Sequence, residues 1–346
     1  MSSVRTIAKQ AGVSITTVSR VLNNHPRVSQ ASRSKVLTAA NAVNYVPAVG
    51  RKSTVNIALV YAGETSLGSP FDAAIMQGMQ GGMEEHGYDL MVLSAQRSRD
   101  RDESYTQMFL RKGVCAAVLR TNAATHGVCE TIAAEGFPSV VVGDRSEASN
   151  VNYVYTASRH ASREGVEHLI ANGHRRIAIC LNVVDDSDHA DRRAGYRDAL
   201  TAAGIEPDPR LEIRVPSGRD SGLPLFRRLR SLQPAPTAVF VTDPFAAVGL
   251  VREAVAAGVD VPGEMSVLGF DDGDARFSVL PTLSAVCQDA VAVGREAVAA
   301  LHRQVQAAAD GPAGGAATAT HVQKALRAWL EIHETTGPVA PTTETN

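Results

Sequence analysis

The stretch that decides the fold is residues 4–24, VRTIAKQAGVSITTVSRVLNN, near the start of a 346-residue chain. Its apolar residues recur at spacings of three and four, which predicts two short helices that each bury one face. Gly12 ends the first helix, because glycine adopts positive φ at low steric cost. Ser14 then caps the second helix with its hydroxyl. The exposed residues of that second helix are short, polar and partly cationic, as a helix in the major groove of DNA requires.

The charge of the chain is unevenly divided. Residues 1–53 hold eight Lys or Arg and no Asp or Glu. The whole chain has 34 basic and 36 acidic residues, so the remainder has 26 basic residues against 36 acidic ones. A compact basic segment on an acidic body indicates a module for a polyanion such as DNA, attached to a body that does not bind one.

Five short motifs in this segment resemble the headpiece of the lactose/galactose-repressor family of transcription regulators. They are Ile7-Ala8, Ala11-Gly12-Val13-Ser14, Thr17-Val18-Ser19-Arg20-Val21-Leu22-Asn23, Arg27-Val28-Ser29 and Tyr45-Val46-Pro47. The resemblance implies a helix-turn-helix DNA-binding headpiece over residues 1–47, with a third helix over about 30–44 that Ser29 caps. The alternative from the residues alone is a small helical hairpin with a solvated polar face. The predicted DNA contacts are Thr6, Ser14, Ile15, Thr16, Thr17, Ser19, Arg20, Asn23, Arg27, Ser29, Tyr45 and Arg51.

A short linker is expected over residues 48–54. In the family this link is usually a longer hinge that folds into a helix on DNA and inserts a Leu into the minor groove. Here the link is shorter and has no matching Leu. We therefore expect Arg51 and Lys52 to contact phosphates instead.

After the linker, apolar strand-like runs alternate with helical runs. Such alternation is typical of an α/β fold with doubly wound parallel sheets. The series breaks near Tyr153–Ser158 and restarts, which indicates two lobes. The resemblance implies the two-lobed fold of periplasmic sugar-binding proteins over residues 55–337, with the chain crossing between the lobes near 155, 287 and 320. The expected strands are Asn56–Tyr61, Leu90–Leu93, Ala116–Leu119, Ser139–Val142, Ile177–Leu181, Ala238–Val241 and Ser266–Gly269.

The last part of the core has less regular patterns. Residues 304–320 are small and flexible and predict a loop, and Leu326–His333 predict one closing strand. Residues 338–346 are expected to form a disordered tail. Met76, Met79 and Met83 share one face of a predicted helix, where they either pack in the core or, as the resemblance implies for this helix, adapt to a partner at a dimer interface.

Ligands of open α/β sheets bind beyond the carboxyl ends of the strands, so polar residues just after each strand are candidates. Arg192 and Asp271 are expected to hold vicinal hydroxyls from two sides, the first donating and the second accepting. Asp243 and Asp271 fit equally well as caps of the helices that follow. The resemblance also implies effector contacts from Ser69-Pro70-Phe71-Asp72, which matches the family's effector loop, and from Arg192, which begins a match to its Arg-x-x-Gly-aromatic pattern. The predicted effector contacts are Ser69, Phe71, Asp72, Arg120, Asp144, Arg192, Thr242, Asp243, Asp271 and Gln288.

Metal and catalytic chemistry find little support in the sequence. Residues 185–191, DDSDHAD, offer oxygen and nitrogen ligands, but a solvated acidic loop before a helix explains them more simply. The chain lacks GxSxG, HExxH, a Walker loop and a GxGxxG after a strand. We therefore predict no cofactor, no metal and no enzymatic activity.

Cysteine usage and hydropathy bear on location. The four cysteines form no CxxC pair, no run of 18 apolar residues occurs, and the N-terminus lacks the apolar core of a signal peptide. These features predict a cytoplasmic protein on the bacterial nucleoid, with no membrane contact.

The combined prediction is a homodimeric transcription repressor. It binds a pseudo-palindromic double-stranded DNA operator, and a small polar effector, such as a carbohydrate, binds between its lobes and controls its operator affinity. The alternatives are a transcriptional activator of the same family, a solute-binding receptor, and an enzyme on the same α/β core.

Overall fold

The computed structural model describes residues 4–22, 28–42, 55–63, 67–310 and 321–340. The first two ranges form a three-helix headpiece of α1 (Val4–Ala11), α2 (Ile15–Leu22) and α3 (Gln30–Ala42). Ile7, Val18 and Val36 are fully buried between these helices. Both predicted caps are present, since the Ser14 hydroxyl accepts the amide of Thr17 at 3.0 Å and the Ser29 hydroxyl accepts that of Ser32 at 3.3 Å. The expected linker, 48–54, lies outside the described residues.

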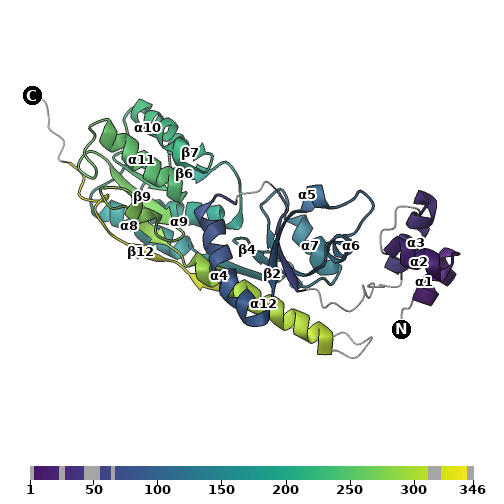
Figure 1. The fold of residues 1–346 in the computed structure, drawn as a ribbon. Helices are drawn as coiled ribbons and strands as arrows, with labels where there is room; N and C mark the ends of the chain where they lie inside the picture. The colour runs from purple at the N-terminus through teal and green to yellow at the C-terminus, as the bar shows by residue number, and fades with distance from the viewer. Residues whose placement is uncertain (1–3, 23–27, 43–54, 64–66, 311–320, 341–346) are drawn as a thin grey trace, which may run out of the picture.

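The rest of the chain forms two α/β lobes, which confirms the predicted fold class (Figure 1). The first lobe contains a six-stranded sheet of order β11-β5-β4-β3-β1-β2, in which every neighbouring pair is parallel. The strands are β1 (Asn56–Tyr61), β2 (Asp89–Ser94), β3 (Val114–Arg120), β4 (Ser139–Val142), β5 (Tyr153–Ala157) and β11 (Gln323–Arg327). Its three central strands are almost entirely buried, as a sheet covered on both faces requires.

The second lobe repeats this plan with a sheet of order β12-β10-β9-β8-β6-β7. All neighbouring pairs are parallel except β10 and β12, which are antiparallel. The strands are β6 (Ile177–Asn182), β7 (Glu212–Val215), β8 (Ala238–Val241), β9 (Ser266–Asp271), β10 (Ser284–Cys287) and β12 (Trp329–Glu331). The parallel strands point the same way, so their following loops gather at one edge, where polar side chains can meet a ligand.

Helices cover both faces of each sheet, and each face has its own apolar core. In the first lobe, α4 (Pro70–His86) and α12 (Ala290–Asp310) cover one face, while α6 (Tyr105–Arg111) and α7 (Gly127–Ala134) cover the other. In the second lobe, α8 (Arg159–Ala171) and α9 (Ser187–Ala202) lie opposite α10 (Gly222–Ser231) and α11 (Pro244–Ala256). Short helical turns complete the lobes: α5 (Ala95–Ser98), η1 (Pro209–Leu211), η2 (Arg219–Ser221) and η3 (Ala275–Ser278).

Two glycines let α4 and α12 approach closely. A Cβ on Gly78 would lie 1.9 Å from the carbonyl oxygen of Val291, and one on Gly294 would lie 2.1 Å from that of Ile75. No side chain fits at either position. The methionine face of α4 packs in the same core, because Met79 is fully buried there; its role at a dimer interface stays a prediction.

The chain crosses between the lobes three times. It crosses at Ser158, between β5 and α8, and again at Gln288 and Asp289, between β10 and α12. The third crossing is at Ala328, and the expected position near 320 is wrong, because β11 belongs to the first sheet and β12 to the second. The single closing strand expected over Leu326–His333 is therefore two strands in two lobes.

Two further expectations for the C-terminal part are corrected. The loop expected over 304–320 begins later, because α12 continues to Asp310 on Ala-rich sequence with high helix propensity. The expected tail over 338–346 is ordered at its start. The amide of Val339 donates to the carbonyl oxygen of Asn172 at 2.9 Å, and residues 341–346 lie outside the described part.

Candidate functional site

The headpiece presents the exposed side of α2. Ile15, Thr16, Ser19 and Arg20 are exposed on this helix, and Thr6 is exposed on α1. Ser14 precedes the first turn of this helix, and its hydroxyl oxygen lies at hydrogen-bond distance, 2.9 Å, from that of Thr17. Ser29 has the corresponding capping role for α3. The remaining predicted DNA contacts lie outside the described residues: Asn23, Arg27, Tyr45 and Arg51.

A cavity of about 1230 Å³ lies between the two lobes. It is bordered by the loops that follow β1 and β3 in the first lobe, and β6, β7, β8 and β9 in the second. This is the carboxyl edge of both sheets, where the topology predicts a ligand. Six of the ten predicted effector contacts line it: Ser69, Phe71, Arg120, Arg192, Thr242 and Asp243.

Arg120 forms the charged part of the first-lobe wall. Its Nε lies 2.8 Å from Asp72 Oδ1, its guanidinium lies over the Phe71 ring at 4.7 Å, and its Nη1 donates to the carbonyl oxygen of Val142 at 2.9 Å. Burial opposes the charge, but Asp72 offsets it and the pKa of Arg120 is raised. Asp72 itself is fully buried beneath Arg120 and does not line the cavity, so it positions the guanidinium.

Arg192 forms the charged part of the second-lobe wall. Only 5% of this residue is exposed. Its guanidinium stacks on Phe270 at 3.5 Å and donates to the carbonyl oxygen of Thr242 at 2.8 Å, and Nη2 lies 3.8 Å from Asp188 Oδ2. Its Nε has no hydrogen-bond partner among the described residues. A buried donor without a partner costs free energy, so this atom is suited to a ligand.

The expected partner of Arg192, Asp271, is the wrong residue. Its carboxylate bonds Arg276 Nη1 at 2.7 Å and accepts the amides at the start of η3, away from the cavity. The next residue, Asp272, lines the cavity instead. Successive side chains of a strand point in opposite directions, so an error of one residue selects the opposite side. Asp271 thus fits the alternative interpretation, in which it holds the following helical turn.

Asp272 is an unusual carboxylate. Burial raises its pKa to about 6, although Arg192 and a hydrogen bond from Gln288 act in the opposite direction. Gln288, another predicted contact, does not line the cavity, and its Nε2 donates a hydrogen bond to Asp272 Oδ1. Asp243 lines the cavity and also caps α11, where it accepts the amide of Ala246 at 2.7 Å. Asp243 therefore caps the following helix, as the alternative interpretation predicts, and also borders the cavity.

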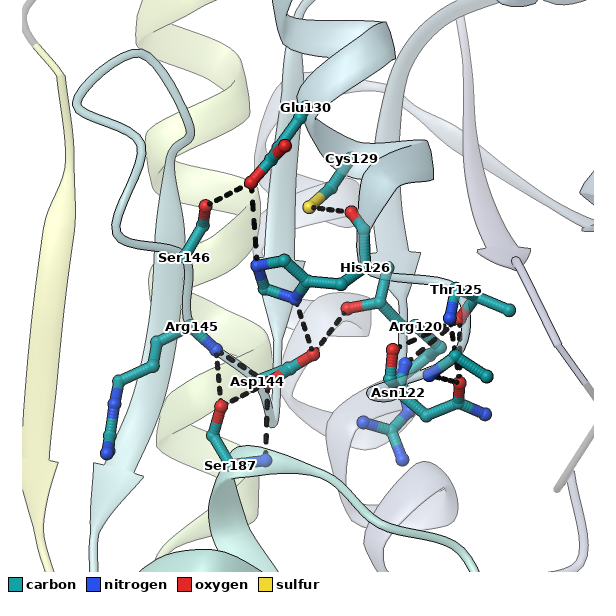
Figure 2. Close-up of polar contacts among 12 residues, drawn as sticks. Arg120, Asn122, Thr125, His126, Cys129, Glu130, Asp144, Arg145, Ser146 and Ser187 are labelled. Carbon is teal, nitrogen blue, oxygen red and sulfur yellow. Dashed lines mark hydrogen bonds and ion pairs between the residues drawn. The ribbon is translucent and has the colours of Figure 1, made fainter.

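Asp144 lies in a contact between the lobes and not in the cavity. It accepts the Thr121 hydroxyl at 2.8 Å from its own lobe. It also accepts the hydroxyl of Ser187 from α9 of the other lobe (Figure 2). Next to it, Arg145 pairs with Asp191 of α9, with Nη1 and Nη2 at 2.8 and 2.9 Å from the two carboxylate oxygens. These bonds join the lobes beside the cavity.

Three acidic residues of the 185–191 run, Asp185, Asp186 and Asp188, reach the cavity, which the sequence interpretation as a solvated loop missed. Asp186 caps α9 and lies 2.8 Å from Nδ1 of His189. Asp188 is buried in the cavity wall, and burial raises its pKa well above the ordinary value despite Arg192. No cluster of metal-ligating side chains occurs within the described ranges. The sequence signal that could have identified these acidic residues is their position after β6, because the other candidates were chosen as polar residues that follow a strand.

Within the described ranges, no helix has both the length and the apolar composition to cross a lipid bilayer.

Comparison with known proteins gives two family matches. Residues 3–48 match bacterial regulatory proteins of the lacI family, and residues 166–325 match the periplasmic binding protein-like domain. The chain is 28% identical over 303 residues to the HTH-type transcriptional regulator DegA of Bacillus subtilis, covering 85% of this chain and 89% of DegA. It is 26% identical over 310 residues to the HTH-type transcriptional repressor PurR of Haemophilus influenzae, covering 88% and 91%.

A solved structure agrees with these matches over almost the entire chain. The transcriptional regulator CelR in complex with cellobiose superposes with a TM-score of 0.68 at 27% identity, covering 97% of this chain and 100% of CelR. The resemblance seen in the sequence motifs of the headpiece is thus confirmed, and the fold of the core agrees with it. This chain belongs to the lacI family of bacterial transcriptional regulators, with a helix-turn-helix headpiece and a periplasmic-binding-protein-like core.

Proposed function

We propose that this regulator is a repressor and that a small polar effector, bound in the interlobe cavity, controls its affinity for the operator. The observation that carries the proposal is a pair of arginines on opposite walls of the same cavity: Arg120 from one lobe, with a side chain 17% exposed, and the buried Arg192 from the other. A ligand that contacts both fixes the distance between the lobes. It therefore binds one lobe arrangement more tightly than others and shifts the population toward it.

The proposed effector is sugar-like. PurR is named a repressor, and CelR was solved with cellobiose; both properties support the proposal for this chain. The walls of the cavity combine aromatic rings with hydrogen-bonding groups, as sites for polyhydroxylated ligands do. Phe71 and Phe245 supply rings, and Arg192 supplies charged donors.

For DNA, we propose that α2 lies in the major groove of one operator half-site, with Arg20 and Thr16 toward the base edges. The headpiece spans residues 1–47 and the linker residues 48–54. A dimer with two-fold symmetry places two headpieces on a pseudo-palindromic operator. Leu280 is 77% exposed and follows the exposed Phe277 by three residues in the second lobe, so these apolar side chains are candidates for the dimer contact. As a chromosomal regulator, the protein acts in the cytoplasm.

The experiment is a gel shift with the full chain on operator DNA, obtained by selection from random duplexes, followed by addition of sugars that raise its melting temperature. The proposal requires specific binding that a stabilising sugar weakens. A sugar that strengthens binding supports corepression in place of induction, and transcription that rises with binding supports the activator alternative. Turnover of the sugar would show an enzyme.

The dimer is tested separately by sedimentation. Replacing Leu280 with Asp places a charge in the candidate contact and should shift the chain toward monomer. The same replacement at Val183, which is exposed near the cavity, is the matched control and should leave the dimer intact.

A further inference from the structure

The charges in the cavity wall do not balance. Arg120 is paired with Asp72 at 2.8 Å, and Asp185 with Arg214 at 2.8 Å. Asp186 lies against His189 at 2.8 Å. What remains in the described wall is Arg192 with three carboxylates, Asp188, Asp272 and the helix-capping Asp243, so negative charge is in excess.

Asp188 shows that this excess points to a ligand. Only 5% of the residue is exposed, and its Oδ1 has no hydrogen-bond partner among the described residues. Its other oxygen lies 3.8 Å from Arg192 Nη2, beyond hydrogen-bond distance. A buried carboxylate without donors is unfavourable, and it gains most from a positively charged donor.

Asp188, Asp272 and Arg192 lie within electrostatic reach of one another. Asp272 raises the pKa of Asp188, and Arg192 lowers the pKa values of both carboxylates. Their pKa values are nevertheless raised, because burial is the largest influence on each. Arg120 also lowers the pKa of Asp188, but its guanidinium is paired with Asp72 at 2.8 Å. Within the described wall, Arg192 is thus the one guanidinium near these buried carboxylates that is not paired with a different carboxylate, and a further cation would complete the set.

An anionic effector fits this wall poorly. Both arginines of the described wall already lie beside a carboxylate: Arg120 is 2.8 Å from Asp72, and Arg192 is 3.8 Å from Asp188. A phosphate or carboxylate of a ligand would therefore add to an existing excess of negative charge. The sugar phosphates and uronic acids are disfavoured relative to neutral and cationic sugars.

We propose that the effector is an amino sugar, whose protonated amine lies between Asp188 and Asp272 while its hydroxyls contact Arg192. This inference rests on the proposed function, because it specifies the ligand of the same cavity. The aromatic rings of Phe71 and Phe245 in the wall suit the apolar faces of a sugar ring. The amine supplies the donors that Asp188 lacks.

The test compares sugars that differ in one substituent, using calorimetry on the full chain at pH 7. The neutral, amino, N-acetylamino and 6-phosphate forms of glucose, galactose and mannose make three matched sets, and cellobiose with the chitosan disaccharide makes a fourth. We expect one amino form to bind at least tenfold more tightly than its neutral parent, and the N-acetylated form to lose this advantage. The affinity of the amino form should rise as the pH rises from 5 to 7, because Asp272 loses its proton over this range. Burial raises the pKa of Asp272 to about 6, with Asp271 and Asp243 acting in the same direction and Arg192 and Gln288 in the opposite one.

Two variants identify the groups responsible. Asp188→Asn should reduce affinity for the amino form at least tenfold and leave or improve affinity for the neutral parent, whereas a merely structural role would weaken both. Asp272→Asn should act in the same way and serves if the first variant does not fold. Asp198→Asn, on the same helix but outside the cavity wall, is the matched control and should change neither affinity.

The outcomes separate this inference from the proposed function. A neutral or phosphorylated form that binds as tightly as its amino form overturns the inference and leaves a sugar-controlled repressor in place. If no sugar of any charge binds while specific DNA binding persists, both the inference and the sugar-like effector are wrong. Absence of specific DNA binding contradicts the proposed repressor function. The calorimetric comparison of the sugars then still decides whether the cavity prefers an amino sugar.

Discussion

Removing the ion pair between Arg145 and Asp191 should loosen the two lobes. Arg145 follows β4 of the first lobe and Asp191 belongs to α9 of the second, with two N–O distances of 2.8 and 2.9 Å. Their side chains are 38% and 11% exposed. Solvent screens such a pair, so its bidentate geometry contributes about 1 kcal/mol. That energy corresponds to roughly a fivefold change in an equilibrium constant.

Hydrogen exchange measures this change without a ligand. The amide of Ala123 in the first lobe donates to the carbonyl oxygen of Asp185 in the second at 2.9 Å, beside the same contact. In Arg145→Ala, peptides containing Ala123 should exchange about fivefold faster, because local opening becomes more favourable. Asp191→Ala should have the same effect, and the double variant should add little to either single one.

A second ion pair on α9 provides the control. Arg159 Nε and Nη2 bond Asp198 at 2.7 and 3.0 Å, with the same bidentate geometry but within one lobe. Arg159→Ala should leave exchange at Ala123 unchanged. Equal exchange in Arg145→Ala and Arg159→Ala would refute the claim that the interlobe pair holds this arrangement.

Three further predictions follow from other parts of the chain. Gly78→Ala should lower the free energy of unfolding in urea by about 1–3 kcal/mol, because its Cβ would lie 1.9 Å from a carbonyl oxygen. Gly81→Ala on the same helix meets nothing within 4 Å and should be neutral or stabilising, so equal effects of the two variants would contradict the predicted clash. The pKa of Asp272 is raised to about 6, so its contribution to stability falls as pH rises from about 4 to 6; Asp272→Asn should remove that fall, worth on the order of 1–3 kcal/mol in urea titrations, and an unchanged pH profile would contradict this. Arg20→Ala should weaken operator binding by roughly 1–3 kcal/mol with little effect on random DNA if Arg20 reads a guanine, and gel shifts on both duplexes measure it; equal losses on both would indicate a phosphate contact, and no loss on either would exclude Arg20 from the interface.

Local rules predicted much of the fold. The Ser14 and Ser29 caps depend on residues within a few positions of each other. The seven predicted strands correspond to β1, β2, β3, β4, β6, β8 and β9, because strands buried on both faces are continuously apolar. The strands β5, β7 and β10 were missed or marked only as a break, since their sequences lack such long runs.

Where the prediction failed, the deciding interaction was distant in sequence or depended on a single residue of register. Asp271 and Asp272 are neighbours, and only the direction of the strand end assigns one to Arg276 and the other to the cavity. The segment 326–333 divides at Ala328 because its halves pair with β5 and β10, more than 40 residues away. Arg120 lines the cavity at the end of its strand, but the ion pair that fixes its guanidinium joins β3 to Asp72 of α4, which is distant in sequence.

The central claim is that this chain reads a specific DNA sequence through its headpiece under control of the interlobe cavity. The most direct measurement is fluorescence anisotropy of the full chain on a duplex selected by it from random DNA, compared with a scrambled duplex at the same salt concentration. The account predicts at least a thousandfold preference for the selected duplex, lowered by a sugar that stabilises the chain and insensitive to that sugar in Arg192→Ala. Equal affinity for both duplexes, or a sugar response that survives intact in Arg192→Ala, would contradict it.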